Sequence, residues 1–163
     1  DTPKARLDQS STYKAIQELQ LFMEYFPESD RKTEAQLMIF NLQDKLVLKD
    51  YLSAKLYYDL GTYTGNASMT TDRRINGNNF QACITTAENA LKDYPTNKYQ
   101  EELNWLILQA KYQQVVNSMA DKQEERARET EDEYYNFVTE YPSSKHLEAA
   151  KRIHKEIQRL LNK

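Results

Sequence analysis

The sequence predicts an all-α fold, namely an α-solenoid of about seven helices packed in antiparallel pairs. The 163 residues contain only three glycines and four prolines, so long helices are expected and a multi-stranded sheet is not. Apolar and small residues recur every three or four positions over most of the chain, as on the buried face of a helix. We expect one domain spanning residues 1–163, which is long enough to bury a core.

A short motif that ends a helix occurs three times, at Pro27, Pro95 and Pro142. Each copy has an aromatic residue directly before the proline, an acidic residue just upstream and a small polar residue two positions downstream. Proline cannot continue a helix and moves the preceding residue out of the α region. Pro27 and Pro95 lie 68 residues apart, twice the 34-residue period of tetratricopeptide repeats. The chain is therefore predicted to consist of such repeats.

Helix packing in these repeats uses large and small side chains at fixed distances before each proline, and a glycine where a helix stops in the left-handed region. The predicted packing positions are Leu19, Phe22, Pro27, Tyr57, Gly61, Cys83, Ala87, Ala90, Pro95, Tyr134, Phe137 and Pro142.

The periodicity and the stop signals place the helices approximately. After a frayed segment of residues 1–9, we expect helices at about 12–26, 31–48, 50–61, 79–94, 99–119, 122–141 and 144–161. Ser10 or Ser11 is expected to cap the first helix, and Asn97 with Gln100 is expected to form a capping box.

Residues 62–79 interrupt the pattern. They hold two of the three glycines, show no periodicity and add about ten residues to a 34-residue repeat. A long loop of this kind is either functional or a tolerated surface insertion, and both interpretations stay open. Arg73 and Arg74 at its centre are candidates for contact with an acidic partner.

Charge and hydropathy exclude several classes of function. The net charge is −3 and there is no run of basic residues, so a nucleic-acid partner is not expected. The longest apolar runs, such as residues 105–108, are far too short to cross a bilayer.

Chemistry-bearing residues are sparse, so we expect neither an enzyme nor a bound cofactor or metal. His146 and His154 are eight residues apart, which turns their side chains about 80° away from each other on a helix, so they are interpreted as surface or packing residues. Cys83 falls on an inward face with no histidine nearby in sequence, which favours a buried, inert thiol.

Twelve tyrosines are many for this length. Those at repeat positions are explained by helix packing. Tyr63, Tyr99 and Tyr112 are harder to place inside, and aromatic side chains on solenoid surfaces often anchor protein partners. Packing and partner binding both remain possible for these three residues.

Three segments carry a family resemblance: KDYLSAKLYYDLGTY, NNFQACITTAENALKDYPTNKYQEELNWLILQAKY and ETEDEYYNFVTEYPSSKHLEAAKRI. Together with YKAIQELQLFMEYFPESDRKTEAQ they resemble the carboxy-terminal repeats of the BamD family, Bacteroidetes type, over roughly residues 5–160. These proteins are tetratricopeptide lipoproteins of the outer-membrane β-barrel assembly machinery.

The resemblance implies a non-catalytic scaffold at the periplasmic face of the outer membrane that docks the barrel-forming BamA-like subunit. Members begin at a lipidated cysteine and carry about two further repeats, so we expect this chain to be a fragment whose membrane association depends on an anchor it lacks. The alternative is another envelope repeat protein, a cell-division or Tol-Pal accessory or one labelled a DNA-uptake lipoprotein, although the acidic pI argues against direct DNA binding.

Overall fold

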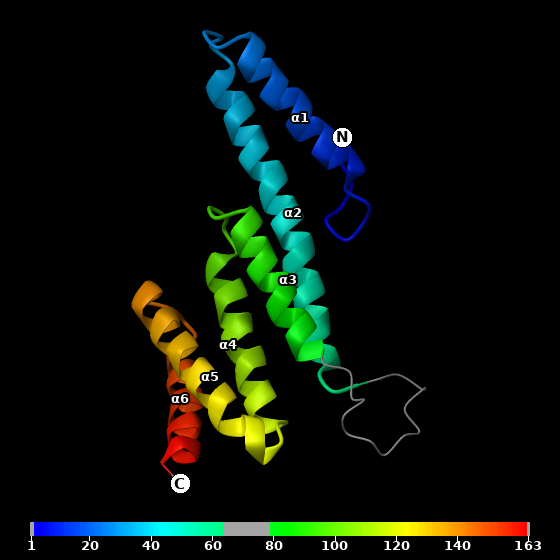
Figure 1. The fold of residues 1–163 in the computed structure, drawn as a ribbon. Coiled ribbons are helices and arrows are strands. Elements are labelled where there is room, and N and C mark those ends of the chain that lie inside the picture. Colours follow the sequence, from blue (N-terminus) through cyan, green and yellow to red (C-terminus); the bar gives the residue numbers. More distant parts are fainter. Residues whose placement is uncertain (1, 64–78, 163) are drawn as a thin grey trace.

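The computed structural model describes residues 2–63 and 79–162, which form an all-helical chain without strands (Figure 1). The predicted all-α class is confirmed. The described residues form six helices rather than the seven expected. They are α1 (Ser10–Tyr25), α2 (Lys32–Leu60), α3 (Asn79–Asp93), α4 (Gln100–Val116), α5 (Ala120–Glu140) and α6 (Leu147–Leu161).

The prediction of separate helices at 31–48 and 50–61 is wrong, because α2 runs through both ranges for 29 residues. No glycine or proline occurs between Lys32 and Leu60, so nothing in the backbone stops the helix. The buried face changes along it: Ile39 and Leu46 pack against α1, whereas Val47 and Ala54 belong to the cluster shared with α3 and α4. This change of face produced the apparent break in periodicity.

Each helix packs against the next one along the chain, and α2 also contacts α4 as α4 contacts α6. Consecutive helices run in opposite directions, with tight turns joining α1 to α2, α3 to α4 and α5 to α6 (Figure 1). The even-numbered helices thus form one connected row.

The three proline turns share one hydrogen-bonding pattern. The small polar side chain two positions after each proline accepts a hydrogen bond from the amide two residues further on, and the next helix begins at the following residue. The pairs are Arg31 with Ser29 at 3.3 Å, Tyr99 with Asn97 at 2.8 Å, and His146 with Ser144 at 2.9 Å. The recurrence seen in sequence is therefore a recurrence of structure.

The capping box expected at Asn97 and Gln100 does not form. Asn97 Oδ1 accepts from the amide of Tyr99, while the Gln100 side chain donates to the carbonyl of Pro95. The Asn97 amide group in turn donates to the carbonyl of Tyr94 at 2.7 Å. The polar side chains thus close the turn itself rather than reaching the third amide of the helix.

The segment before α1 is ordered rather than frayed, because Gln9 is buried within it. Gln9 Nε2 donates to the carbonyls of Lys4 at 2.8 Å and Leu7 at 3.0 Å, and its Oε1 accepts from Thr12 Oγ1 at 2.7 Å. Asp8, not Ser10 or Ser11, supplies the first capping contact, since its carboxylate accepts from the amide of Ser10 at 3.0 Å.

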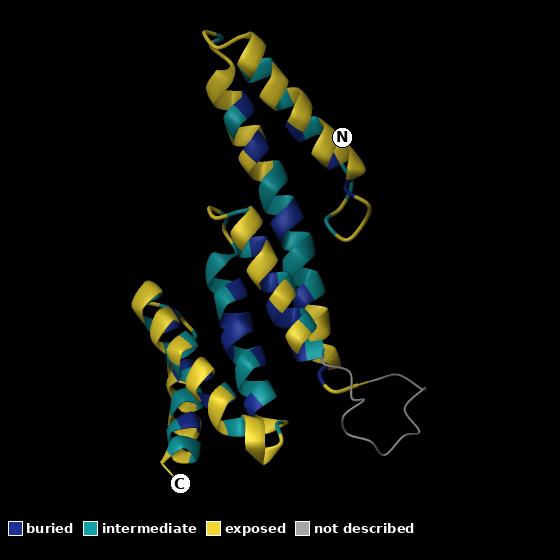
Figure 2. Ribbon diagram, in the orientation of Figure 1, coloured by how far each residue is buried: buried dark blue, intermediate teal, exposed yellow. Residues whose placement is uncertain are grey.

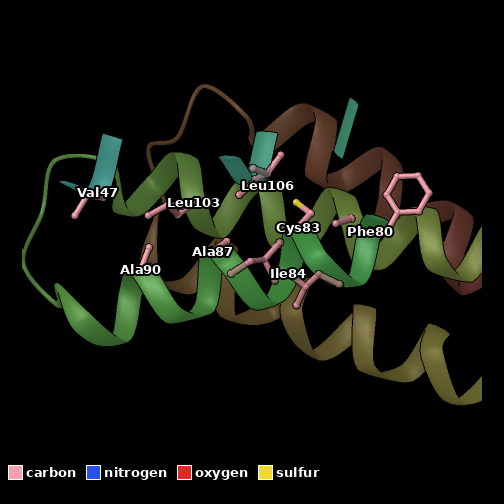
Figure 3. Close-up of a cluster of buried hydrophobic side chains, with 11 residues drawn as sticks. Val47, Phe80, Cys83, Ile84, Ala87, Ala90, Leu103 and Leu106 are labelled. Atoms are coloured by element: carbon pink, nitrogen blue, oxygen red, sulfur yellow. The ribbon is translucent and has the colours of Figure 1, made fainter. Parts of the chain in front are cut away.

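The largest hydrophobic cluster lies between α2, α3 and α4 (Figure 3). Cys83, Ala87 and Ala90 of α3 are at most 1 % exposed, and these small side chains let α3 approach both neighbours closely. The cluster also includes Val47 of α2 and Leu103 of α4. A second side of α4 packs against α5 and α6, so that almost all of α4 is buried or intermediate in exposure (Figure 2).

Gly61 ends α2 as the sequence predicted, but in a different conformation from the expected left-handed one. Its φ of 53° and ψ of −115° match the first central residue of a type II′ turn. The amide of Tyr63 closes that turn by donating to the carbonyl of Leu60 at 2.9 Å. A Cβ at this position would lie 3.1 Å from Phe80 Cζ in the core.

Replacement of Gly61 by alanine is expected to lower the free energy of unfolding by about 1–3 kcal/mol, since the backbone conformation is strained for any side chain and the added Cβ crowds Phe80. Urea denaturation followed by circular dichroism measures this. Thr62→Ala, at the exposed neighbouring position, is the matched control and should change stability by less than about 0.5 kcal/mol. Equal stabilities for the two variants would contradict the assignment of a strained, crowded turn position to Gly61.

Candidate protein-binding surface

The residues proposed as partner contacts do not converge on one site. Tyr63, which follows α2, is 60 % exposed. Tyr99 directly precedes α4 and Tyr112 lies thirteen residues further on, about 20 Å along the helix. Arg73 and Arg74 lie outside the described residues.

Tyr99 is largely engaged in contacts within the chain. Its ring stacks on Tyr51 of α2, with centroids 6.0 Å apart and an angle of 13° between the planes, and Lys98 Nζ lies 5.3 Å from its centroid. Lys98 also pairs with Asp44 of α2 at 3.5 Å. The start of α4 is thereby attached to the preceding even-numbered helix.

The same pair of contacts recurs after the next proline turn, at Pro142. Lys145 and His146 stand three and four positions after Pro142, as Lys98 and Tyr99 do after Pro95. Lys145 pairs with Glu102 of α4 at 2.6 Å, and the His146 ring stacks on Trp105 of α4, with centroids 4.8 Å apart and planes at 10°. A cation and a flat ring after the turn therefore bind a carboxylate and an aromatic ring of the preceding even-numbered helix.

Glu102 receives both a cationic and a histidine contact, because His146 Nε2 lies 3.3 Å from its carboxylate. Burial raises the pKa of Glu102, but the hydrogen bonds and charges of Lys145 and His146 outweigh burial, and the net effect is a lowered pKa. The folded protein thus favours the ionised carboxylate.

A hollow of about 230 Å³ is lined by residues of α2, α4 and α6, and Tyr112 is one of them. Its lining combines aromatic rings, two glutamine amides and one exposed guanidinium. The lining residues are Tyr58, Trp105, Gln109, Tyr112, Gln113, Ala149, Arg152 and Ile153. Tyr112 also packs against a core cluster of α4, α5 and α6, so it is only partly available to a partner. Such a mixture of aromatic and polar groups is typical of protein interaction sites.

His154 forms a second stack, on α5. Its ring lies 4.2 Å from that of Tyr134, with planes at 6°, and its Nε2 is 3.2 Å from a carboxylate oxygen of Glu131. Both histidine rings therefore pack α6 against neighbouring helices. Of the two interpretations offered from the sequence, surface residue and packing residue, the structure matches packing. No group of three or more metal-ligating side chains occurs among residues 2–63 and 79–162.

Most predicted packing positions lie inside or at the edge of the core. Cys83, Ala87, Ala90 and Phe137 are buried, as is Gly61, and Leu19 and Tyr134 are partly buried at cluster edges. Phe22 is half-buried and packs on Phe26 with centroids 5.6 Å apart. The prolines act through their turns and are exposed, and Tyr57 of α2 is 36 % exposed.

The tip formed by α1 and the first half of α2 exposes several large apolar side chains, each at least 42 % exposed. They include Leu21, Tyr25, Phe26, Leu37, Met38 and Phe40. The first half of α2 projects past the α3–α4 turn (Figure 1), so α1 is the only described helix that covers it.

No protein-family model matches the chain, and no curated protein matches it in sequence. Among the described residues, no helix has both the length and the apolar composition that a bilayer span requires.

Replacement of Glu102 by glutamine is expected to lower the free energy of unfolding at pH 7 by about 1 kcal/mol, because the contacts with Lys145 and His146 favour the carboxylate. A lowered pKa in the folded state contributes stability above the ordinary value of 4.5, and this contribution is lost as the pH falls through the folded value. The difference between wild type and variant should therefore shrink between pH 7 and pH 3 in urea denaturation. Glu88→Gln, at an exposed position of α3, is the control.

Cys83 is expected to resist thiol reagents in the folded protein. It is fully buried, and burial raises its pKa to about 12, so the reactive thiolate is scarce at pH 8. Reaction with a chromogenic disulfide should be at least about a hundredfold slower than in guanidinium chloride, where burial no longer protects the thiol. Fast labelling of the folded chain would contradict the packing of α3.

Proposed function

We propose that this chain is an α-solenoid of tetratricopeptide-like repeats that acts as a non-catalytic scaffold in the assembly of outer-membrane β-barrel proteins. The observation that carries the solenoid is the recurrence of one turn structure after Pro27, Pro95 and Pro142. In repeat proteins each unit packs mainly on its neighbours, and the packing of consecutive helices supports this arrangement.

A scaffold needs a surface that holds a partner, and the hollow between α2, α4 and α6 is our candidate. Its aromatic floor and amide groups suit a protein surface, and Arg152 at its rim is exposed. The likeness of the later repeats to BamD proteins supports a BamA-like barrel protein as that partner. The proposed place of action is the periplasmic face of the outer membrane.

The test is an affinity purification of the tagged full-length protein from its native membranes, followed by mass spectrometry. We expect a BamA-like barrel protein to be recovered from the wild type. Arg152→Glu places a negative charge at the rim of the hollow and should reduce that recovery at least about tenfold. Lys155→Glu makes the same charge change at an exposed position of the same helix and should leave recovery unchanged.

Recovery of cell-division or Tol-Pal proteins in place of a barrel protein would overturn the assembly role and favour the alternative envelope function. Equal loss with Arg152→Glu and Lys155→Glu would move the docking surface away from the hollow. Circular dichroism of both variants checks that the helices remain folded.

A further inference from the structure

A second recess, of about 400 Å³, lies between the N-terminal segment and the carboxy-terminal half of α2. We call it the α2 groove. It is lined by Arg6, Lys49, Leu52, Ser53, Lys55, Leu56 and Asp59. None of these residues belongs to the hollow between α2, α4 and α6, and the groove follows a different face of α2 from the one that meets α3.

The wall of the groove is held in place before any partner arrives. Buried Gln9 fixes the backbone at Lys4 and Leu7 on either side of Arg6. Lys45 of α2 also donates to the side chain of Thr2 and, at 3.4 Å, to its carbonyl. A preformed site of this kind loses little conformational entropy on binding.

The floor is apolar and has the spacing of one helix face. Leu52 is half-buried and Leu56, four residues later, is 58 % exposed. The lining residues of α2 run from Lys49 to Asp59, about 15 Å of helix. Side chains three and four residues apart form the ridges against which another helix packs. The shape therefore suits a helical partner segment.

The lining of the groove carries three cations, Arg6, Lys49 and Lys55, and one carboxylate, Asp59. Lys55 pairs with Asp59 at 3.3 Å. Arg6 and Lys49 form no salt bridge with a carboxylate in the described part of the chain, and Lys49 attracts the carboxylates of Asp8 and Asp50 only from a longer distance. Two cations without a salt bridge, beside half-buried Leu52 and exposed Leu56, complement a ligand that carries carboxylates next to apolar side chains.

We infer that the α2 groove docks an acidic amphipathic helix of a partner protein, with its apolar side chains on Leu52 and Leu56 and its carboxylates facing Arg6 and Lys49. This inference rests on the proposed scaffold function and gives the scaffold a second docking surface, separate from the hollow. A protein with two such surfaces holds two partners at once, which is what a scaffold in an assembly machine must do.

The test uses two synthetic peptides of roughly 18 residues, long enough to form a helix. Both carry leucines on one face, flanked by glutamates in the first peptide and by lysines in the second. Fluorescence anisotropy with the purified chain should show binding of the glutamate peptide and at least about tenfold weaker binding of the lysine peptide. Arg6→Glu with Lys49→Glu should weaken binding of the glutamate peptide by at least about tenfold, and so should Leu56→Ser alone.

The matched control is Lys14→Glu with Lys92→Glu, two exposed cations on α1 and α3 that make the same change in net charge. It should leave binding unchanged, and circular dichroism should show equal helix content for all variants. No binding, equal binding of both peptides, or equal loss in both double variants would overturn the inference. Binding to anionic lipid vesicles in place of the peptide, or dimerisation through this face in sedimentation, would overturn it as well.

The two proposals fail separately. If the peptide does not bind but a barrel protein is still recovered from membranes, docking at the α2 groove is rejected and the proposed assembly scaffold stands. Peptide binding without recovery of a barrel protein would leave the groove as a docking site on a scaffold of different function.

Discussion

The structure depends on the burial of α4. This helix contacts α2, α3, α5 and α6, and it contributes side chains to hydrophobic clusters on two sides. Its buried residues are Leu103, Trp105, Leu106, Ile107, Leu108, Ala110 and Val115. A helix that is apolar around most of its circumference must be enclosed by other elements, and this requirement places the neighbouring helices around it.

Two of the enclosing contacts are held in register by the residues after the turns at Pro95 and Pro142. Lys98 and Tyr99 attach the start of α4 to α2, and Lys145 and His146 attach the start of α6 to α4. Surface ion pairs alone contribute little stability, but the stacked rings beside them bury apolar area and fix orientation. The even-numbered helices therefore form a row whose surface carries the hollow, on which the proposed docking of a barrel protein depends.

The length of α2 gives the chain its second surface. Because α2 runs unbroken for 29 residues, its first half packs on α1 while its second half packs on α3 and α4. Leu52 and Leu56 of α2 belong to neither of these two clusters. Together with Arg6 of the N-terminal segment, they line the α2 groove.

Local sequence signals determined much of this protein. The aromatic-proline motifs determined the three turns, and Gly61 determined the end of α2. The spacing of Cys83, Ala87 and Ala90 determined the buried face of α3. Each of these effects acts over a few residues of backbone, so the local sequence is enough to predict it. Tertiary structure decided the rest. The unbroken α2, the burial of Gln9 and the contacts of Glu102 with Lys145 and His146 depend on which helix faces which. The Glu102 and His146 side chains meet across 44 positions, and no periodicity within one helix reports a meeting at that distance.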